Sequence, residues 1–218
     1  MYNDIRKELC MDIEYEKLIK FDELKGVIKE KRTTVSYVEQ DAGLGKQRVS
    51  RLITGWGIPL SDVPARIASV LGVPVSRIMK FKGIRERKWF GERVNPYIRP
   101  DEPEGKLTYE PLRFTMNMYL DYYFEKTGKE KTVSDLYDMI EPCRRRNGIK
   151  VDPDISRLSV EKRFGAGYKS KRERKYVAKG LTPETRRKLK NDEPVNLRTI
   201  YDLCSFFGCS IDWVMSYK

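Results

Sequence analysis

The chain has 218 residues, of which 39% are hydrophobic and 35% charged, and it carries a formal net charge of +12 with no histidine. This length predicts one or two domains, and the lack of imidazole excludes Ser-His-Asp and Cys-His nucleophile systems and metal sites that need histidine. No apolar run is long enough to span a membrane, and the N-terminal residues do not resemble a signal peptide, so we expect a cytoplasmic protein.

Enzyme chemistry has no support in the sequence. Of the four cysteines, Cys204 and Cys209 are close in the chain but Cys10 and Cys143 are distant, which disfavours a zinc site. There is no Walker-type phosphate loop, and no pair of carboxylates stands out in an apolar setting. We therefore expect a protein that is not an enzyme and that holds no cofactor or metal.

The positive charge is concentrated in one part of the chain. Residues 143–190 contain 17 Lys and Arg against 5 Asp and Glu, which accounts for the whole net charge of +12. A basic block on an otherwise neutral chain indicates binding to a polyanion such as nucleic acid. The alternative is a solvated charged surface, the usual place of scattered Lys and Arg.

Residues 21–80 predict a series of short helices. The segment "TTVSYVEQDAG" has Thr34 as an N-cap and Gly43 as a C-terminal stop. The segment "LSDVPARIASVLG" has Ser61 as an N-cap and Gly72 as the stop. We expect two helices at these positions, with a third between them.

That third helix, within "GKQRVSRLITG", has two different faces. Val49, Leu52 and Ile53 are spaced to form one apolar face. The other side carries only donors, acceptors and positive charge, from Lys46, Gln47, Arg48, Ser50, Arg51 and Thr54. Such a helix suits the major groove of DNA, because Arg and Lys pair with guanine edges and Gln pairs with adenine edges. The alternative is an ordinary solvated surface.

The middle of the chain changes character. Residues 83–110 are rich in proline, which lacks an amide donor and restricts the residue before it, and they predict a connector. Residues 111–150 predict a helical linker or dimerisation region. The helix that starts at Pro111 is apolar on most faces, as is typical of a core helix or of an oligomer interface. Of these, the core helix is the commoner case. Specific DNA binding usually needs two modules per site, which the chain could supply by itself or by dimerising through residues 116–124, and we favour the homodimer.

Residues 151–218 predict a second group of helices. Thr182 followed by Pro183 is a strong helix start, Asn196 caps the next helix, and Gly208 ends it. The segment "RFGAGYKSKRERKYVAKG" precedes this start and combines positive charge with aromatic residues. It contributes further candidates for nucleic-acid contacts: Lys169, Lys171, Arg172 and Arg174.

The two groups of helices repeat one plan. Gly43 and Gly72 are 29 residues apart, Gly180 and Gly208 are 28 apart, and a leucine lies nine residues after the first glycine of each pair. Both groups resemble the Cro/C1-type helix-turn-helix domain of phage repressors and mobile-element regulators. The resemblance implies an all-α fold of two small lambda-repressor-like modules, residues 1–82 and 151–218.

The resemblance also implies a binding site on double-stranded DNA. By family precedent, Lys46, Gln47 and Arg51 contact bases, while Arg48, Ser50 and Thr54 contact phosphates. The segment "TPETRRKLKND" takes the place of the recognition helix in the second module. Its candidate DNA-binding residues are Thr182, Glu184, Arg187, Lys188 and Lys190.

Both copies depart from the family pattern. The family has a small residue, often Ala, four positions before the turn glycine, where this chain has Glu39 and Tyr176. We expect Glu39 to be unable to pack against the recognition helix, which predicts a splayed or shifted helix pair. In the second copy, Arg186 replaces the apolar residue and leaves Leu189 as the inward anchor. Two segments, "DPDISRLSVEKRF" and "TVSDLYDMIEPCRRR", compete for the first helix of this copy.

The expected function is that of a sequence-specific DNA-binding transcriptional regulator, a repressor of phage or mobile-element type. The alternative is an anti-defence protein or adaptor, for example an inhibitor of a CRISPR nuclease, that docks on a protein–nucleic acid complex. RNA or a ribonucleoprotein would then be the partner. A regulator binds its own site far better than random duplex, whereas an adaptor binds duplex weakly and without sequence preference.

Overall fold

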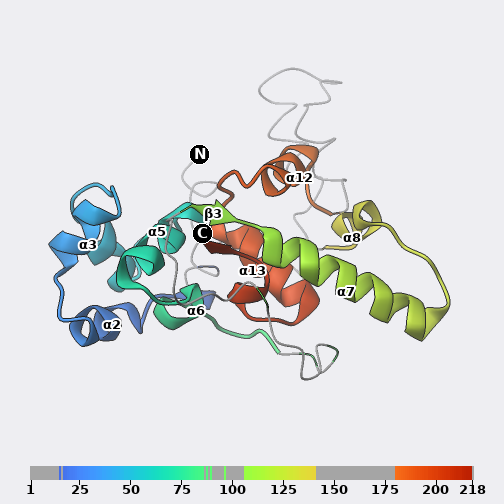
Figure 1. Cartoon of the computed structure of the whole chain (residues 1–218), viewed down its shortest axis with the longest axis horizontal. Coiled ribbons are helices and arrows are strands. Elements are labelled where there is room, and N and C mark those ends of the chain that lie inside the picture. The colour runs from blue at the N-terminus through green and yellow to red at the C-terminus, as the bar shows by residue number, and fades with distance from the viewer. Residues whose placement is uncertain are drawn as a thin grey trace, which may run out of the picture.

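The computed structural model describes residue 15, residues 17–85, residues 87, 89 and 96, residues 106–140 and residues 180–217. These residues are mostly helical and include two small antiparallel sheets of two strands each (Figure 1). The predominance of helices agrees with the all-α class expected from the sequence. The described residues fall into two halves that contain the same kinds of element in the same order.

The N-terminal half is closed by a sheet that joins its two ends. Its elements are β1 (Ile19–Lys20), α2 (Leu24–Glu30), α3 (Val35–Asp41), α4 (Arg48–Ile53), α5 (Asp62–Leu71), α6 (Val75–Ile78) and β2 (Lys80–Phe81). β1 pairs with β2 in antiparallel register. Between them, α3 packs against both α4 and α5.

The C-terminal half is assembled from the two stretches on either side of residues 141–179. Its elements are β3 (Leu107–Thr108), α7 (Glu110–Thr127), α8 (Val133–Met139), α12 (Pro183–Lys190), α13 (Leu197–Phe207), the 3-10 helix η2 (Ile211–Trp213) and β4 (Ser216–Tyr217). β3 pairs with β4, and α7 contacts both α8 and η2. The segment that was expected to be a linker or dimerisation region therefore packs with the C-terminal helices.

Most of the predicted helix ends are confirmed. The side chains of Thr34, Thr182 and Asn196 each accept a hydrogen bond from a backbone N–H of the helix that follows. Gly72 and Gly208 end α5 and α13 in the left-handed conformation. This agreement is expected, because caps depend on residues that are close together in the sequence.

Ser61 is at the predicted N-cap position but makes no capping hydrogen bond. Its hydroxyl lies between the two halves of the molecule instead, where it accepts from the N–H of Val195 at 3.1 Å and bonds the hydroxyl of Tyr109 at 2.6 Å. Both hydroxyl-bearing residues are fully buried. The polar groups between the halves thereby satisfy one another, as burial requires.

The two halves pack about an approximate two-fold relation. Leu60 and Asn196 form an isolated antiparallel bridge, in which Ser61 N–H donates to Val195 at 2.8 Å and Leu197 N–H donates to Pro59 at 3.2 Å. Each half thus gives the other the same hydrogen bond. Residues that correspond to one another meet at this bridge, as they do in the interface of a symmetric dimer.

Further contacts follow the same relation. Ser76 N–H donates to the carboxylate of Asp212 at 3.1 Å, and these residues are 136 positions apart. Leu60 and Asn196 have the same separation. The Tyr217 hydroxyl donates to the Val73 carbonyl at 2.9 Å, so that β4 lies against the end of α5. The halves lie side by side, with α5 and α6 facing α13 (Figure 1). One continuous hydrophobic core extends through both.

The buried hydroxyl of Tyr109 predicts a loss of stability at high pH. Burial raises the pKa of Tyr109 from 10.0 to about 12. Between these values the unfolded chain loses the proton while the folded chain keeps it, so the free energy of unfolding falls as the pH rises from about 10 to about 12. Urea unfolding over this range should show a shallower fall for Tyr109→Phe than for the unchanged protein. Identical pH profiles would contradict the prediction.

Candidate nucleic-acid interface

The α4 helix presents one buried and one exposed face. Val49 and Leu52 are 0% and 3% exposed and fix the helix to the core. Ile53 is half-buried beside them. The predicted contact residues are all exposed: Lys46, Gln47, Arg48, Ser50, Arg51 and Thr54. The sequence pattern therefore assigned the two faces correctly, while the contacts with DNA stay a prediction.

The start of α4 is held by Glu39. This residue is only 8% exposed, and its two carboxylate oxygens accept from the N–H of Gln47 at 3.0 Å and of Val49 at 2.9 Å. A carboxylate at this place satisfies amide donors that have no partner within the helix and interacts favourably with the helix dipole. The expectation that Glu39 cannot pack against the recognition helix is wrong, because its side chain is long enough to cap that helix.

Two of the predicted base contacts lie just before the helix. Lys46 belongs to the turn, and Gln47 occupies the N-cap position of α4 with a φ of 64°. A residue other than glycine adopts this left-handed conformation at a cost of about 1–2 kcal/mol. The hydrogen bond from Gln47 N–H to Glu39 helps to offset that cost and fixes the direction in which the Gln47 side chain leaves the turn.

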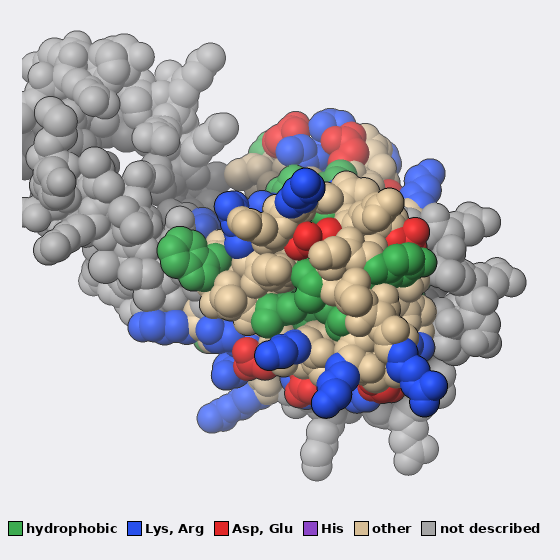
Figure 2. Space-filling model, turned by 90° about the vertical axis from the view of Figure 1, so that its left-hand side faces the viewer, with side chains coloured by type: hydrophobic (Ala, Val, Ile, Leu, Met, Phe, Trp, Pro, Cys, Tyr) green, Lys and Arg blue, Asp and Glu red, His purple; other side chains and the backbone are tan. Residues whose placement is uncertain are grey.

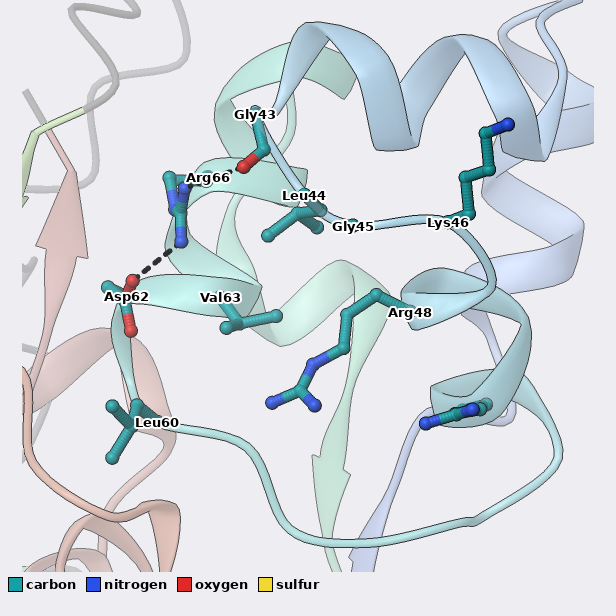
Figure 3. A pocket seen from close by; sticks show the side chains of 10 residues that line it. Gly43, Leu44, Gly45, Lys46, Arg48, Leu60, Asp62, Val63 and Arg66 are labelled. Carbon is teal, nitrogen blue, oxygen red and sulfur yellow. Dashed lines mark hydrogen bonds and ion pairs between the residues drawn. The ribbon is translucent and has the colours of Figure 1, made fainter.

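An open depression of about 470 Å³ lies between the start of α4 and the start of α5 (Figure 3). Its lining comprises Gly43, Leu44, Gly45, Lys46, Arg48, Arg51, Leu60, Asp62, Val63 and Arg66. Figure 3 shows Arg48 extending from α4 into the depression, whereas Lys46 points away from it. Three arginines, Arg48, Arg51 and Arg66, thus contribute positive charge to a surface concavity beside the exposed face of α4.

Arg66 has a structural role in this depression. Its guanidinium pairs with Asp62 at 2.8 Å and donates to the carbonyls of Ala42 at 3.2 Å and Gly43 at 3.3 Å. Arg66 therefore fastens α5 to the turn before α4. Lys46, Arg48 and Arg51 form no ion pair with any residue that the structure describes. No sequence pattern singles out Arg66, because its role depends on how α5 packs against the turn.

Sequence reasoning also passed over Trp56. This side chain is 75% exposed and lies three residues after the end of α4, between Gly55 and Gly57, both of which have positive φ. Its backbone N–H donates to the Arg51 carbonyl at 2.8 Å, which ties it to the end of the helix. The "GWG" motif was the available signal. A space-filling view of the N-terminal half shows exposed apolar groups between Lys and Arg side chains (Figure 2).

The second candidate helix, α12, is attached through a charged residue. Arg186 forms an ion pair with Asp138, donates from Nε to the Leu181 carbonyl at 2.9 Å, and lies over the ring of Tyr137. These contacts replace the apolar anchor that Val49 provides in α4. Leu189, which is 1% exposed, supplies the inward contact expected from the sequence.

The remaining charges of α12 are largely paired with one another. Arg187 binds both Glu184, at 3.2 Å, and Glu193, and Lys188 lies 3.6 Å from Glu184. Hydrogen bonds from Arg187 hold the pKa of Glu184 below its usual value. Thr182 bonds the N–H of Thr185, so it acts as a cap. The face of α12 therefore mixes carboxylates with cations, unlike the face of α4.

In the C-terminal half, α8, from the segment "TVSDLYDMI", takes the place relative to α12 that α3 has relative to α4. Leu181 N–H donates to the Tyr137 carbonyl at 3.0 Å, as Leu44 N–H donates to Glu39 at 2.7 Å. Gly180 has a φ of 87°, and a Cβ at this position would lie 2.3 Å from the Tyr137 oxygen. The alternative segment lies outside the described residues, as do Tyr176 and the four candidates Lys169, Lys171, Arg172 and Arg174.

Comparisons with protein-family models, with curated proteins and with solved structures found no match to this chain. Among the described residues, no helix has both the length and the apolar character needed to cross a membrane. The same part of the chain contains no group of three or more side chains placed to bind a metal ion. Cys204 and Cys209 are buried thiols, and burial raises the pKa of Cys204.

Proposed function

We propose that this protein binds double-stranded DNA in a sequence-specific manner and regulates transcription as a repressor that occupies its operator. The two halves are, in this proposal, two helix-turn-helix modules within one chain. The observation that carries it is the exposed surface of α4 and the turn before it. There, Lys46, Arg48 and Arg51 form no ion pair with any described residue, and all three line the depression. Arg, Lys and Gln side chains are suited to base edges in the major groove.

The rigidity of this face supports the proposal. Glu39 fixes the turn before α4, and Arg66 joins that turn to α5. The turn before α4 is fixed at two points, so the helix has a defined position relative to α3 and α5, as a base-reading helix requires.

The proposal is tested by selection from a library of random duplexes. The full chain should enrich one sequence and bind it at least 1,000-fold more tightly than random duplex at the same salt concentration, in the range typical of specific DNA binding. Weak and salt-sensitive binding to every duplex alike would contradict the proposal. The protein would then fit the alternative of an adaptor on a protein–nucleic acid complex, which the self-paired charges of α12 favour.

Substitutions of the predicted base contacts at Gln47 and Arg51 should affect binding to the selected sequence only. Gln47→Ala or Arg51→Ala is expected to weaken binding to that sequence by about 1–3 kcal/mol, because each removes hydrogen bonds to a base edge. Binding to random duplex should change little. Fluorescence anisotropy at fixed salt measures both affinities, and Lys25→Ala, which removes an exposed cation from α2, is the matched control. Equal losses on all duplexes would assign these residues to phosphate contacts.

The basic segment should contribute affinity without specificity. Replacing Lys169, Lys171, Arg172 and Arg174 with glutamine is expected to weaken binding to every duplex alike. Each phosphate contact that is lost should reduce the slope of log affinity against log salt concentration by about 0.9. A salt titration of the variant and the unchanged protein measures this slope. Unchanged affinity and slope in a folded variant would show that these residues do not contact DNA.

A further inference from the structure

We infer that the chain recognises DNA as a monomer and asymmetrically: α4 reads the bases of one half-site, and α12 reads none. The inference rests on the proposed function and specifies its ligand, a duplex with a single specified half-site and no palindrome. Its starting point is the approximate two-fold packing of the two halves, combined with the different charge arrangements on α4 and α12.

The surface through which the two halves contact each other is already buried within one chain. Leu60 pairs with its counterpart Asn196, and Ser76 with its counterpart Asp212. An interface in which corresponding residues meet is closed, because each half uses the patch that the other half needs. A second copy of the chain cannot bind there without displacing the C-terminal half. The C-terminal half thus has the position of a partner subunit.

The helix considered for dimerisation adds little free surface. Within residues 116–124, Met116, Met118 and Tyr119 are 1%, 6% and 9% exposed, because α7 packs inside its own half. Phe124, at 51%, is the most exposed large hydrophobic residue of that segment. A homodimer through α7 would therefore rest on Phe124 and on parts of the half-buried Leu120, Tyr122 and Tyr123. Four partly covered side chains are few beside the roughly 20–30 residues that each partner contributes to a stable interface.

The two candidate recognition helices differ at corresponding positions. When Gly43 is matched with Gly180, Gln47 corresponds to Glu184 and Arg51 to Lys188. The α4 side therefore has an amide and a guanidinium that forms no ion pair with any described residue. The α12 side has a carboxylate bonded to Arg187 and 3.6 Å from Lys188.

This difference decides which helix reads bases. Exposed ion pairs are weak, so pairing alone would not keep Arg187 or Lys188 from a phosphate. The carboxylates of Glu184 and Glu193 remain on the α12 face whichever partner the cations choose, and they repel the DNA backbone. Arg186 is paired with Asp138 and does not supply a base contact in their place. The α12 side therefore presents carboxylates among its cations, whereas residues 46–54 on the α4 side carry cations and no carboxylate.

The test uses the full chain and the duplex that it selects from a random library. We expect a selected sequence without two-fold symmetry, and a complex of one chain per duplex by light scattering. Arg51→Ala should lower the ratio of specific to random binding at least 10-fold, whereas the counterpart Lys188→Ala should change it less than 2-fold. Replacing both Glu184 and Glu193 with glutamine should tighten binding to all duplexes, since it removes repulsion.

The outcomes separate this inference from the proposed function. A palindromic sequence bound by two chains, or equal losses for Arg51→Ala and Lys188→Ala, would overturn the asymmetric reading and leave DNA recognition intact. Failure to select any sequence would overturn the proposed function, and the asymmetric reading with it. Far-ultraviolet circular dichroism of each variant shows whether a loss comes from unfolding. Arg51 is exposed and Lys188 is half-buried, and neither belongs to the hydrophobic core, so both variants should fold.

Discussion

Glu39→Ala is expected to lower the free energy of unfolding by about 2–3 kcal/mol and to abolish specific binding to DNA. The substitution leaves the N–H groups of Gln47 and Val49 without their charged acceptor, and the second of these groups is buried. Hydrogen bonds to charged groups are each worth about 1.5–3 kcal/mol. Without the carboxylate, the left-handed turn at Gln47 also loses its support. Urea unfolding and anisotropy on the selected duplex measure the two effects.

The controls for this prediction separate charge from position. Glu39→Gln keeps one acceptor oxygen and should retain part of the stability. Glu23→Ala removes an exposed carboxylate whose ion pair with Lys80 lies at the surface, and it should cost less than about 1 kcal/mol. If Glu39→Ala were as stable as Glu23→Ala, the carboxylate would have no role in holding α4.

Phe207→Ala is expected to destabilise both halves at once, by about 3–5 kcal/mol. Phe207 is fully buried at the end of α13 and packs against the rings of Tyr119 and Phe206. Because one core extends through the two halves, they should unfold in a single transition. Phe124→Ala, which truncates a phenylalanine that is 51% exposed, is the matched control and should change the stability little.

Two probes of unfolding distinguish the halves. Tryptophan fluorescence reports mainly on the C-terminal half, because Trp56 is 75% exposed whereas Trp89 and Trp213 pack against the core. Hydrogen exchange of α3 and α5 amides reports on the N-terminal half alone. Coincident shifts after Phe207→Ala would show that the C-terminal half stabilises the α4 face. Exchange in α3 and α5 that is unaffected by the substitution would contradict the single transition.

Local features of this fold were predictable from the sequence, and long-range ones were not. The caps at Thr34 and Thr182 and the stop at Gly208 depend on a few neighbouring residues. The two faces of α4 follow from the spacing of Val49 and Leu52. The membership of residues 111–140 in the C-terminal half was missed, because nothing near α7 in sequence indicates that it packs with η2.

The exposed residues of the candidate site were predicted from the sequence, but the residues that hold α4 in place were not. Exposure of Arg51 follows from the helical period alone. The role of Glu39 depends on the geometry of the turn between it and Gln47, and the family pattern suggested the opposite. The role of Arg66 depends on the approach of α5 to the turn at Gly43. Contacts of this kind join elements whose relative placement cannot be predicted from local sequence patterns.

The division of the C-terminal half into two stretches of sequence has a consequence for the order of folding. The bond that fixes α4 to α3 joins Gln47 and Glu39, which are 8 residues apart, whereas Arg186 and Asp138 are 48 apart. Closing the longer loop costs about 1.5 kcal/mol more in chain entropy. The N-terminal half is continuous and leaves the ribosome first, so it forms early and offers the surface around Leu60 and Ser76 as a template. Lengthening the segment between Ile140 and Gly180 should then slow the last step only slightly, because each doubling of a loop costs about 0.6 kcal/mol.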